Sequence, residues 1–253
     1  METIKYYPIL SSFKCVTFSD THNLHEGVKL PKCDIAIFNG DYSGRGNKFE
    51  TLHFLRWYSK QDQCKYKVMI PGNHDICFDP KHNGETHAQN WLERMQKQFN
   101  NIIILNNSMV NIENVKIWGS PVTPWYHGDR WGYNMPDDEI YRVWETIPPN
   151  MDIVVTHGPV HGILDKVIDL NTKKEKHVGC KVLKDILINR VKPQFHLCGH
   201  IHEGYGSTSG YGTIFINSSI VNLDYERVNK PIKFTVSRVD REYWNRLEKE
   251  KEA

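Results

Sequence analysis

Five short polar clusters carry the residue types that could do chemistry in this sequence of 253 residues. Each contains an aspartate, an asparagine or a histidine, and most adjoin a glycine: Asp20-Thr21-His22, Gly40-Asp41, Gly72-Asn73-His74-Asp75, His157-Gly158 and Gly199-His200-Ile201-His202. Carboxylate and amide oxygens combined with imidazole nitrogens suit Mn, Fe, Zn, Ni or Co, and they do not favour a thiolate site. The clusters therefore predict a centre for divalent metal ions.

The candidate ligands are too many for a single tetrahedral ion. There are seven of them: Asp20, His22, Asp41, Asn73, His157, His200 and His202. Two ions need a shared carboxylate, and Asp41 is the natural bridge. Two cations about 3.5–4 Å apart can hold a hydroxide between them and bind the oxygens of a phosphoryl group during in-line displacement. The expected chemistry is phosphoester hydrolysis.

The elements that must position these clusters are short apolar runs, which are typical of buried strands. Most clusters follow such a run directly, and the runs cover 14–18, 34–38, 66–70, 101–105, 115–119, 152–156, 194–198, 213–217 and 232–239. Helical patterns occupy 48–61, 87–99, 137–147 and 179–191, and a short charged helix is expected at 241–253. The alternation predicts an α/β fold in which side chains beyond the strand ends meet at one edge. If the backbone stays extended there, the two side chains within each pair, Asp20/His22 and His200/His202, should point in the same direction.

Composition limits the classes of protein to consider. Hydrophobic residues make up 39% and charged residues 25%, a balance typical of a globular protein, and we expect one domain over 1–253. The net charge is +2 and the sequence contains no basic stripe, so a nucleic-acid partner is not expected. No run reaches the roughly 18 apolar residues of a membrane helix. Six cysteines without CxxC spacing favour a reducing, cytoplasmic location, and the oligomeric state stays open.

The five clusters, in this order, resemble the complete motif set of the calcineurin-like metallophosphoesterases, from residue 20 to residue 202. The stretches "GHIHEGYG" (199–206), "INSS" (216–219), "NKPI" (229–232) and "GSPVTPWY" (119–126) are similar to the metallophosphoesterase-domain subgroup. Described members of that subgroup hydrolyse cyclic nucleotides and other phosphodiesters. Val160 departs from the subgroup, which usually has proline there. The resemblance implies a four-layer α-β-β-α sandwich of mixed sheets.

The resemblance also implies a role for each residue. Asp20, His22 and His202 would hold one ion, Asn73, His157 and His200 the other, and Asp41 would bridge them. Manganese is the first candidate, and Fe, Zn, Ni, Co and Mg are alternatives. His74 would assist the leaving group, Asp75 would orient the His74 imidazole, and a metal-bridging hydroxide would be the nucleophile.

The substrate implied by the resemblance is a small nucleotide, and a cyclic diester is the leading form. Candidate contacts are Trp125, Tyr126, His161 and Asn217. Trp125, Tyr126 and Trp131 could stack on a base or cover the core, while Asn217 could shape the pocket floor or occupy a turn. Asp20 and Asp41 could also cap a helix or turn. The alternative functions are a phosphomonoesterase, protein phosphatase or nuclease with the same core, or a nucleotide sensor with weak turnover.

Overall fold

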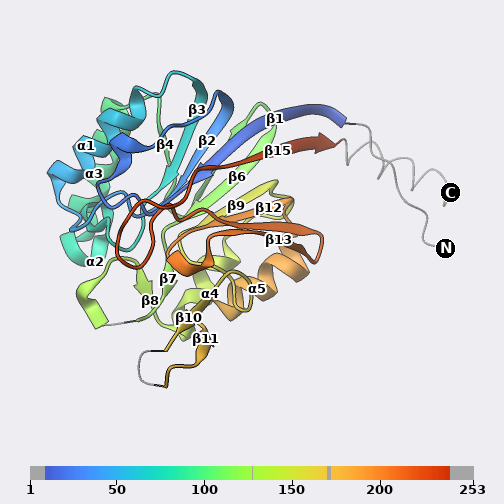
Figure 1. Cartoon of the computed structure of the whole chain (residues 1–253). Helices are drawn as coiled ribbons and strands as arrows, with labels where there is room; N and C mark the ends of the chain where they lie inside the picture. The colour runs from blue at the N-terminus through green and yellow to red at the C-terminus, as the bar shows by residue number, and fades with distance from the viewer. Residues whose placement is uncertain (1–8, 127, 170–171, 240–253) are drawn as a thin grey trace.

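Two mixed β-sheets pack face to face in the centre of the structure (Figure 1). The computed structural model describes residues 9–126, 128–169 and 172–239. The first sheet has the strand order β15-β1-β2-β3-β4, and the second has the order β13-β14-β12-β9-β6-β5. Inner strands run parallel in both sheets, whereas β15, β13 and β5 pair antiparallel with β1, β14 and β6.

The strands of the first sheet are β1 (Ile9–Phe18), β2 (Cys33–Asn39), β3 (Cys64–Ile70), β4 (Ile103–Ile104) and β15 (Ile232–Val239). Those of the second are β5 (Ser108–Ile112), β6 (Val115–Ser120), β9 (Ile153–Thr156), β12 (Phe195–Cys198), β13 (Gly206–Gly210) and β14 (Thr213–Asn217). Two further pairs are β7 (Thr123–Pro124) with β8 (Asn134–Met135), and β10 (Lys166–Ile168) with β11 (Glu175–His177). All nine predicted strands coincide with observed ones. The sequence patterns missed β5, β13 and the two short pairs.

Helices cover the outer face of each sheet (Figure 1). They are α1 (Lys48–Ser59), α2 (Pro80–Asn83), α3 (Glu85–Gln98), α4 (Asp137–Glu145) and α5 (Lys181–Ile186), which continues as the π-helical η4 (Leu187–Val191). Short 3₁₀ turns are η1 (His25–Gly27), η2 (Ile76–Phe78), η3 (Gly128–Arg130) and η5 (His202–Gly204). All four helical patterns within the described residues are present, and the charged helix expected at 241–253 lies outside them. Helix α1 begins at a capping box, in which the Asn47 side chain accepts from the backbone of Glu50.

The structure has four layers, and an apolar cluster fills each of the three spaces between them. The first joins α1 and α3 to the first sheet, where Phe54 packs against Phe38 with ring centroids 4.5 Å apart. The second fills the space between the sheets. The third joins α4 and α5 to the second sheet, where Trp144 meets Trp118 edge to face at 6.2 Å. The expected four-layer α-β-β-α sandwich is confirmed. Within the described residues, no helix has the length and apolar character to cross a membrane.

A buried asparagine joins the two sheets just below the polar clusters. Asn39 ends β2, and its Nδ2 donates to Thr17 Oγ1 at 2.8 Å in the same sheet. The same Nδ2 lies 2.9 Å from Ser218 Oγ and 3.2 Å from Cys198 O, which belong to the second sheet and its following loop. The carboxyl ends of β2 and β12 are therefore held together by hydrogen bonds as well as by apolar packing.

Candidate metal centre

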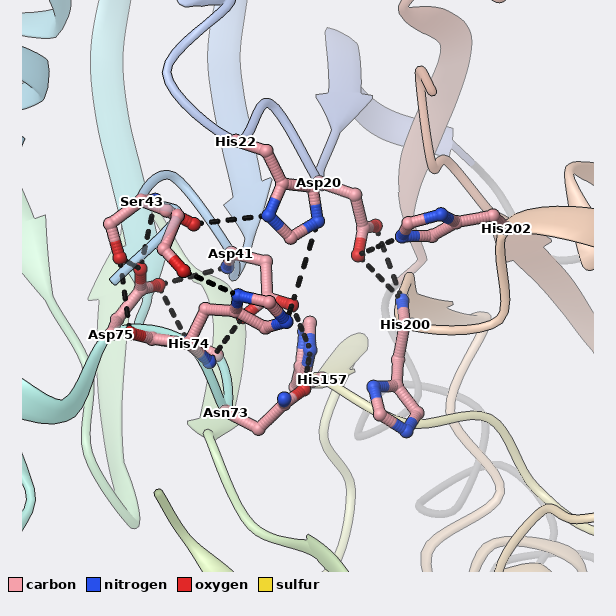
Figure 2. Close-up of polar contacts among 12 residues, drawn as sticks. Asp20, His22, Asp41, Ser43, Asn73, His74, Asp75, His157, His200 and His202 are labelled. Carbon is pink, nitrogen blue, oxygen red and sulfur yellow. Dashed lines mark hydrogen bonds and ion pairs between the residues drawn. The ribbon is translucent and has the colours of Figure 1, made fainter. Parts of the chain in front are cut away.

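The seven predicted ligands converge where the two sheets end (Figure 2). Asp20 and His22 follow β1, Asp41 follows β2, and Asn73 follows β3. The second sheet supplies three ligands: His157 after β9, and His200 and His202 after β12. All seven are buried except His200 and His202, which are half-buried. Each sheet therefore contributes one side of the centre.

The chain leaves the extended conformation at the ligands themselves. The φ angles are +54° at Asp20, +38° at His22, +62° at Asp41 and +67° at His200. These are left-handed conformations, which are costly for residues other than glycine and concentrate at functional sites. The extended backbone that would make the side chains of Asp20/His22 and of His200/His202 point the same way is absent, because the chain turns at both pairs.

The donor atoms form two groups that meet at Asp41. Asp20, His22 and His202 make one group, and Asp41, His157 and His200 make the other, with all donor atoms of a group within 4.8 Å of one another. Asp41 Oδ2 lies 3.2 Å from His157 Nε2 and 3.9 Å from His22 Nε2, so it reaches both groups. The Asn73 amide joins the second group, since its Oδ1 is 2.9 Å from His157 Nε2.

Backbone carbonyls fix the orientation of the imidazoles. The Nδ1 atoms of His22, His157 and His202 donate to the carbonyl oxygens of Ser43 (3.0 Å), Asn39 (2.8 Å) and Asn222 (3.0 Å). Each carbonyl can only accept, so Nδ1 carries a proton and Nε2 is the atom that faces the centre. This arrangement is typical of histidines that bind metals. The Nε2 of His22 is buried and has no hydrogen-bond partner among the described residues, as expected of a ligand atom, so the residues fit divalent ions.

The pKa values of Asp41, His22 and His200 favour the charge states that bind a cation. Burial opposes ionisation of Asp41, but the neighbouring His157 charge holds the pKa of this carboxyl well below its usual value. Burial lowers the pKa of His22 to about 4 and that of His200 to about 3, so both are neutral near pH 7. His157 differs: burial would lower its pKa, but the Asp41 charge raises it to about 9.

His74 lies beside the centre and has two geometrically allowed roles. Its backbone N donates to Asp41 Oδ1 at 2.8 Å, and its ring Nδ1 donates to Gly44 O at 3.0 Å. Its Nε2 is 4.0 Å from Asp41 Oδ2, and His22, Asp41 and His74 also bring their donor atoms within 4.8 Å of one another. The imidazole can therefore approach a phosphoryl group beside the ions, or act as a further ligand.

The expected role of Asp75 is corrected by its contacts. Its carboxylate accepts from the backbone N atoms of Gly72, Asp41, Tyr42 and Ser43 at 2.8–3.3 Å, and from Ser43 Oγ at 2.6 Å. The His74 imidazole is held by Gly44 O instead. The sharp turn after β2 aims consecutive N–H groups inward, and these need a buried acceptor. Asp75 thus supports the loop that carries Asp41.

The predicted substrate contacts separate into different environments. The Tyr126 ring lies edge to face with His200 at 5.0 Å, so it borders the second ligand group. Trp125 is 53% exposed, and His161 lies 5.6 Å from the His177 ring.

Asn217 is not placed to touch a substrate, which corrects that prediction. It is fully buried, and its Nδ2 donates to Ile201 O at 2.8 Å and Gly199 O at 3.2 Å. Its Oδ1 accepts from Ser219 N at 3.1 Å. The side chain therefore holds the loop that presents His200 and His202.

Two further aromatic residues border the centre. Trp131 stacks on His74, with ring centroids 4.1 Å apart and planes 29° apart. Tyr225 lies edge to face with His22 at 4.7 Å and with His202 at 5.5 Å. Sequence reasoning missed Tyr225, because its loop contains no recognised motif. The only available signal was an aromatic residue in a polar loop shortly after "INSS" (216–219).

Comparisons with known proteins show similarity in family and in fold. The family profile described as calcineurin-like phosphoesterase matches residues 15–204. Metallophosphoesterase domain-containing protein 1 from Homo sapiens and that from Mus musculus are each 35% identical over 239 residues, covering 89% of this chain and 71% of theirs. The crystal structure of phosphopantetheinyl hydrolase from Mycobacterium tuberculosis has a TM-score of 0.56 at 15% identity, over 90% of this chain and 96% of that one. This last likeness concerns the fold.

Proposed function

This chain belongs to the calcineurin-like phosphoesterase family and is a metal-dependent phosphoester hydrolase, and from that premise we propose that it hydrolyses diesters of small, cyclic nucleotides. The observation that carries the metal dependence is the set of three imidazoles whose Nδ1 atoms are held by backbone carbonyls. The preference for diesters rests on the motif resemblance and on the charge around the centre.

The ligand set proposed for the ions follows the two groups of donor atoms. Asp20, His22 and His202 would hold the first ion, Asn73, His157 and His200 the second, and Asp41 would bridge them, with manganese as first candidate. When bound, two divalent ions supply positive charge to the phosphoryl oxygens and lower the pKa of a water molecule.

The surrounding charge supports a monoanionic substrate. The described contacts of the seven ligands and His74 include carbonyls, carboxylates, hydroxyls and aromatic rings, but no lysine or arginine side chain. A phosphomonoester carries close to two negative charges at pH 7 and a diester carries one. A site without added cationic side chains therefore suits the diester.

His74 is proposed to protonate the leaving oxygen of the diester. Its Nδ1 is occupied by Gly44 O, so Nε2 is the atom that reaches the centre. An alkoxide leaving group is strongly basic, and proton transfer from a positioned imidazole contributes about 10²–10⁴-fold. Tyr126 and Tyr225 stand beside opposite ligand groups, where their rings can contact a base.

The cellular location is proposed from the cysteines. All six are free and buried, which supports work in a reducing compartment such as the cytoplasm.

The test is turnover of the manganese-loaded protein on 2',3'-cAMP, 3',5'-cAMP, bis(p-nitrophenyl) phosphate and p-nitrophenyl phosphate, with a chelated control. We expect chelator-sensitive hydrolysis of the diesters and weak monoester hydrolysis. His74→Ala should retain its metal content and lose at least about 100-fold in turnover of the cyclic nucleotides. Faster monoester than diester hydrolysis would replace the proposal with a phosphomonoesterase. No detectable hydrolysis of any of the four substrates, with two ions bound per chain, would indicate a nucleotide sensor.

A further inference from the structure

The loop that carries Trp131 is fastened to the segment that carries His74. Gly132 N donates to Asn73 O at 2.8 Å, and Tyr133 N donates to Asp79 Oδ2 at 3.3 Å. A Cβ at Gly132 would lie only 3.2 Å from Ile76 Cγ2, which shows how closely the two segments approach. Trp131 is therefore held at a fixed position relative to the backbone of His74.

Three groups surround the His74 ring on separate sides. The Trp131 indole covers one face, with centroids 4.1 Å apart and planes 29° apart. Gly44 O accepts from Nδ1 at 3.0 Å, and the His22 ring lies at 4.6 Å with its plane turned by 73°. The hydrogen bond to Gly44 O fixes the direction of Nδ1. The stack sets the plane of the ring and therefore the direction of Nε2.

We propose that Trp131 is a positioning residue, which holds the His74 imidazole so that Nε2 faces the oxygen of the leaving group. A proton donor must come within about 2.6–3.2 Å of the oxygen that it protonates. A misplacement of about 1 Å can cost 10²-fold in rate. The inference rests on the proposed diesterase function, because it assigns Trp131 to the proton transfer of that reaction.

The experiment compares Trp131→Ala and Trp131→Phe on aryl methyl phosphate diesters. The leaving groups run from p-nitrophenolate, which needs little protonation, to unsubstituted phenolate, and 2',3'-cAMP supplies an alkoxide. We expect Trp131→Ala to lose about 10–100-fold more kcat on phenolate and alkoxide than on p-nitrophenolate. Trp131→Phe, which keeps an aromatic face, should stay within about threefold. Phe49→Ala, at an 85% exposed position on α1, is the matched control and should change nothing.

A second arm asks whether Trp131 acts through His74. Adding Trp131→Ala to His74→Ala should cause no further selective loss on poor leaving groups, because residues that act as a unit are not additive. An equal loss on every leaving group, or an undiminished selective loss in the His74→Ala background, would overturn the proposal and make Trp131 a direct substrate contact.

A readout without turnover separates this inference from the proposed function. In the magnesium-loaded protein, the His74 ring protons should show an upfield NMR shift from the indole, and Nδ1–H should exchange slowly. Trp131→Ala should abolish the shift and speed the exchange at least tenfold. If the wild type hydrolyses no diester, the proposed function fails, and this exchange rate alone decides whether Trp131 holds the ring. Unchanged exchange in Trp131→Ala would refute positioning.

Discussion

Replacing Asp41 by asparagine tests the electrostatic account of the centre most directly. The substitution keeps an acceptor for the His74 N–H, which now bonds Oδ1 at 2.8 Å, but removes the charge 3.2 Å from His157 Nε2. That charge raises the pKa of His157 from 6.5 to about 9 against the opposing effect of burial. Because protonation is linked to folding, a pKa shift of this size contributes about 2–3 kcal/mol to the free energy of unfolding at pH 7.

The sign of the pH dependence follows from the raised pKa. Protonated His157 is favoured in the folded state, so the contribution is fully present below pH 6.5 and disappears as the pH rises through about 9. In chelator, Asp41→Asn should therefore unfold about 2–3 kcal/mol more easily than wild type at pH 7, and the deficit should shrink towards zero at pH 10. Asp62→Asn, at an exposed position, should match wild type at both pH values.

The same variant also tests the bridging position. A metal present at 100 times its Kd stabilises a protein by about 2.7 kcal/mol per site. Because Asp41 reaches both groups, Asp41→Asn should lose this gain at both sites, whereas Asp20→Asn should lose it at one. Urea unfolding with EDTA and with manganese measures both quantities. The reasoning would be refuted if manganese stabilised Asp41→Asn as much as it stabilises wild type. It would also be refuted if the deficit of Asp41→Asn in the free energy of unfolding, measured in chelator, did not change with pH.

Three further substitutions have defined outcomes. Burial lowers the pKa of His196 to about 3, so between pH 7 and 5 the unfolded chain binds a proton at this ring that the folded chain does not. In chelator, the free energy of unfolding of wild type should fall by about 2 kcal/mol more than that of His196→Phe over this pH range, and an equal fall in both proteins would contradict this. Asp75→Ala leaves five donors without their acceptor and should lower the free energy of unfolding by at least about 3 kcal/mol; an unchanged urea midpoint would count against the loop-supporting role. Tyr225→Ala should raise KM for cyclic nucleotides about tenfold at unchanged metal content, since stacking on a base is worth about 1–3 kcal/mol; an unaltered KM would exclude the contact.

The strands and helices were largely predictable because their signals are local. Buried parallel strands such as β2 and β9 are continuous apolar runs, and α1 carries its capping residues in its own sequence. By contrast, β13 has the sequence Gly-Ser-Thr-Ser-Gly, and it is a strand only because β14 offers an antiparallel partner along its edge. Pairing of this kind depends on tertiary structure, which the local pattern does not contain.

The candidate ligands were predictable for a similar reason, while their supports were not. Aspartate and histidine placed directly after strands are visible in the sequence. The partners of Asp75 and Asn217 are backbone groups, and these become neighbours only when separate loops meet. His200 and His202 point in different directions because His200 has a left-handed backbone conformation. A histidine in the sequence does not indicate such a conformation. Tyr225 reaches His22 across about two hundred positions of the chain, so sequence distance concealed it.

The division of the ligands between two sheets has a consequence for how the protein matures. The ends of β1, β2 and β3 hold four candidate ligands, and those of β9 and β12 hold three, so neither half of the chain contains a complete centre. The bonds from Asn39 to Ser218 and Cys198 form only when the halves dock. A complete set of candidate ligands therefore exists only when both halves of the chain are folded against each other. A nascent chain that has finished only its first half holds four of the seven candidate ligands and so lacks a complete hydrolytic centre.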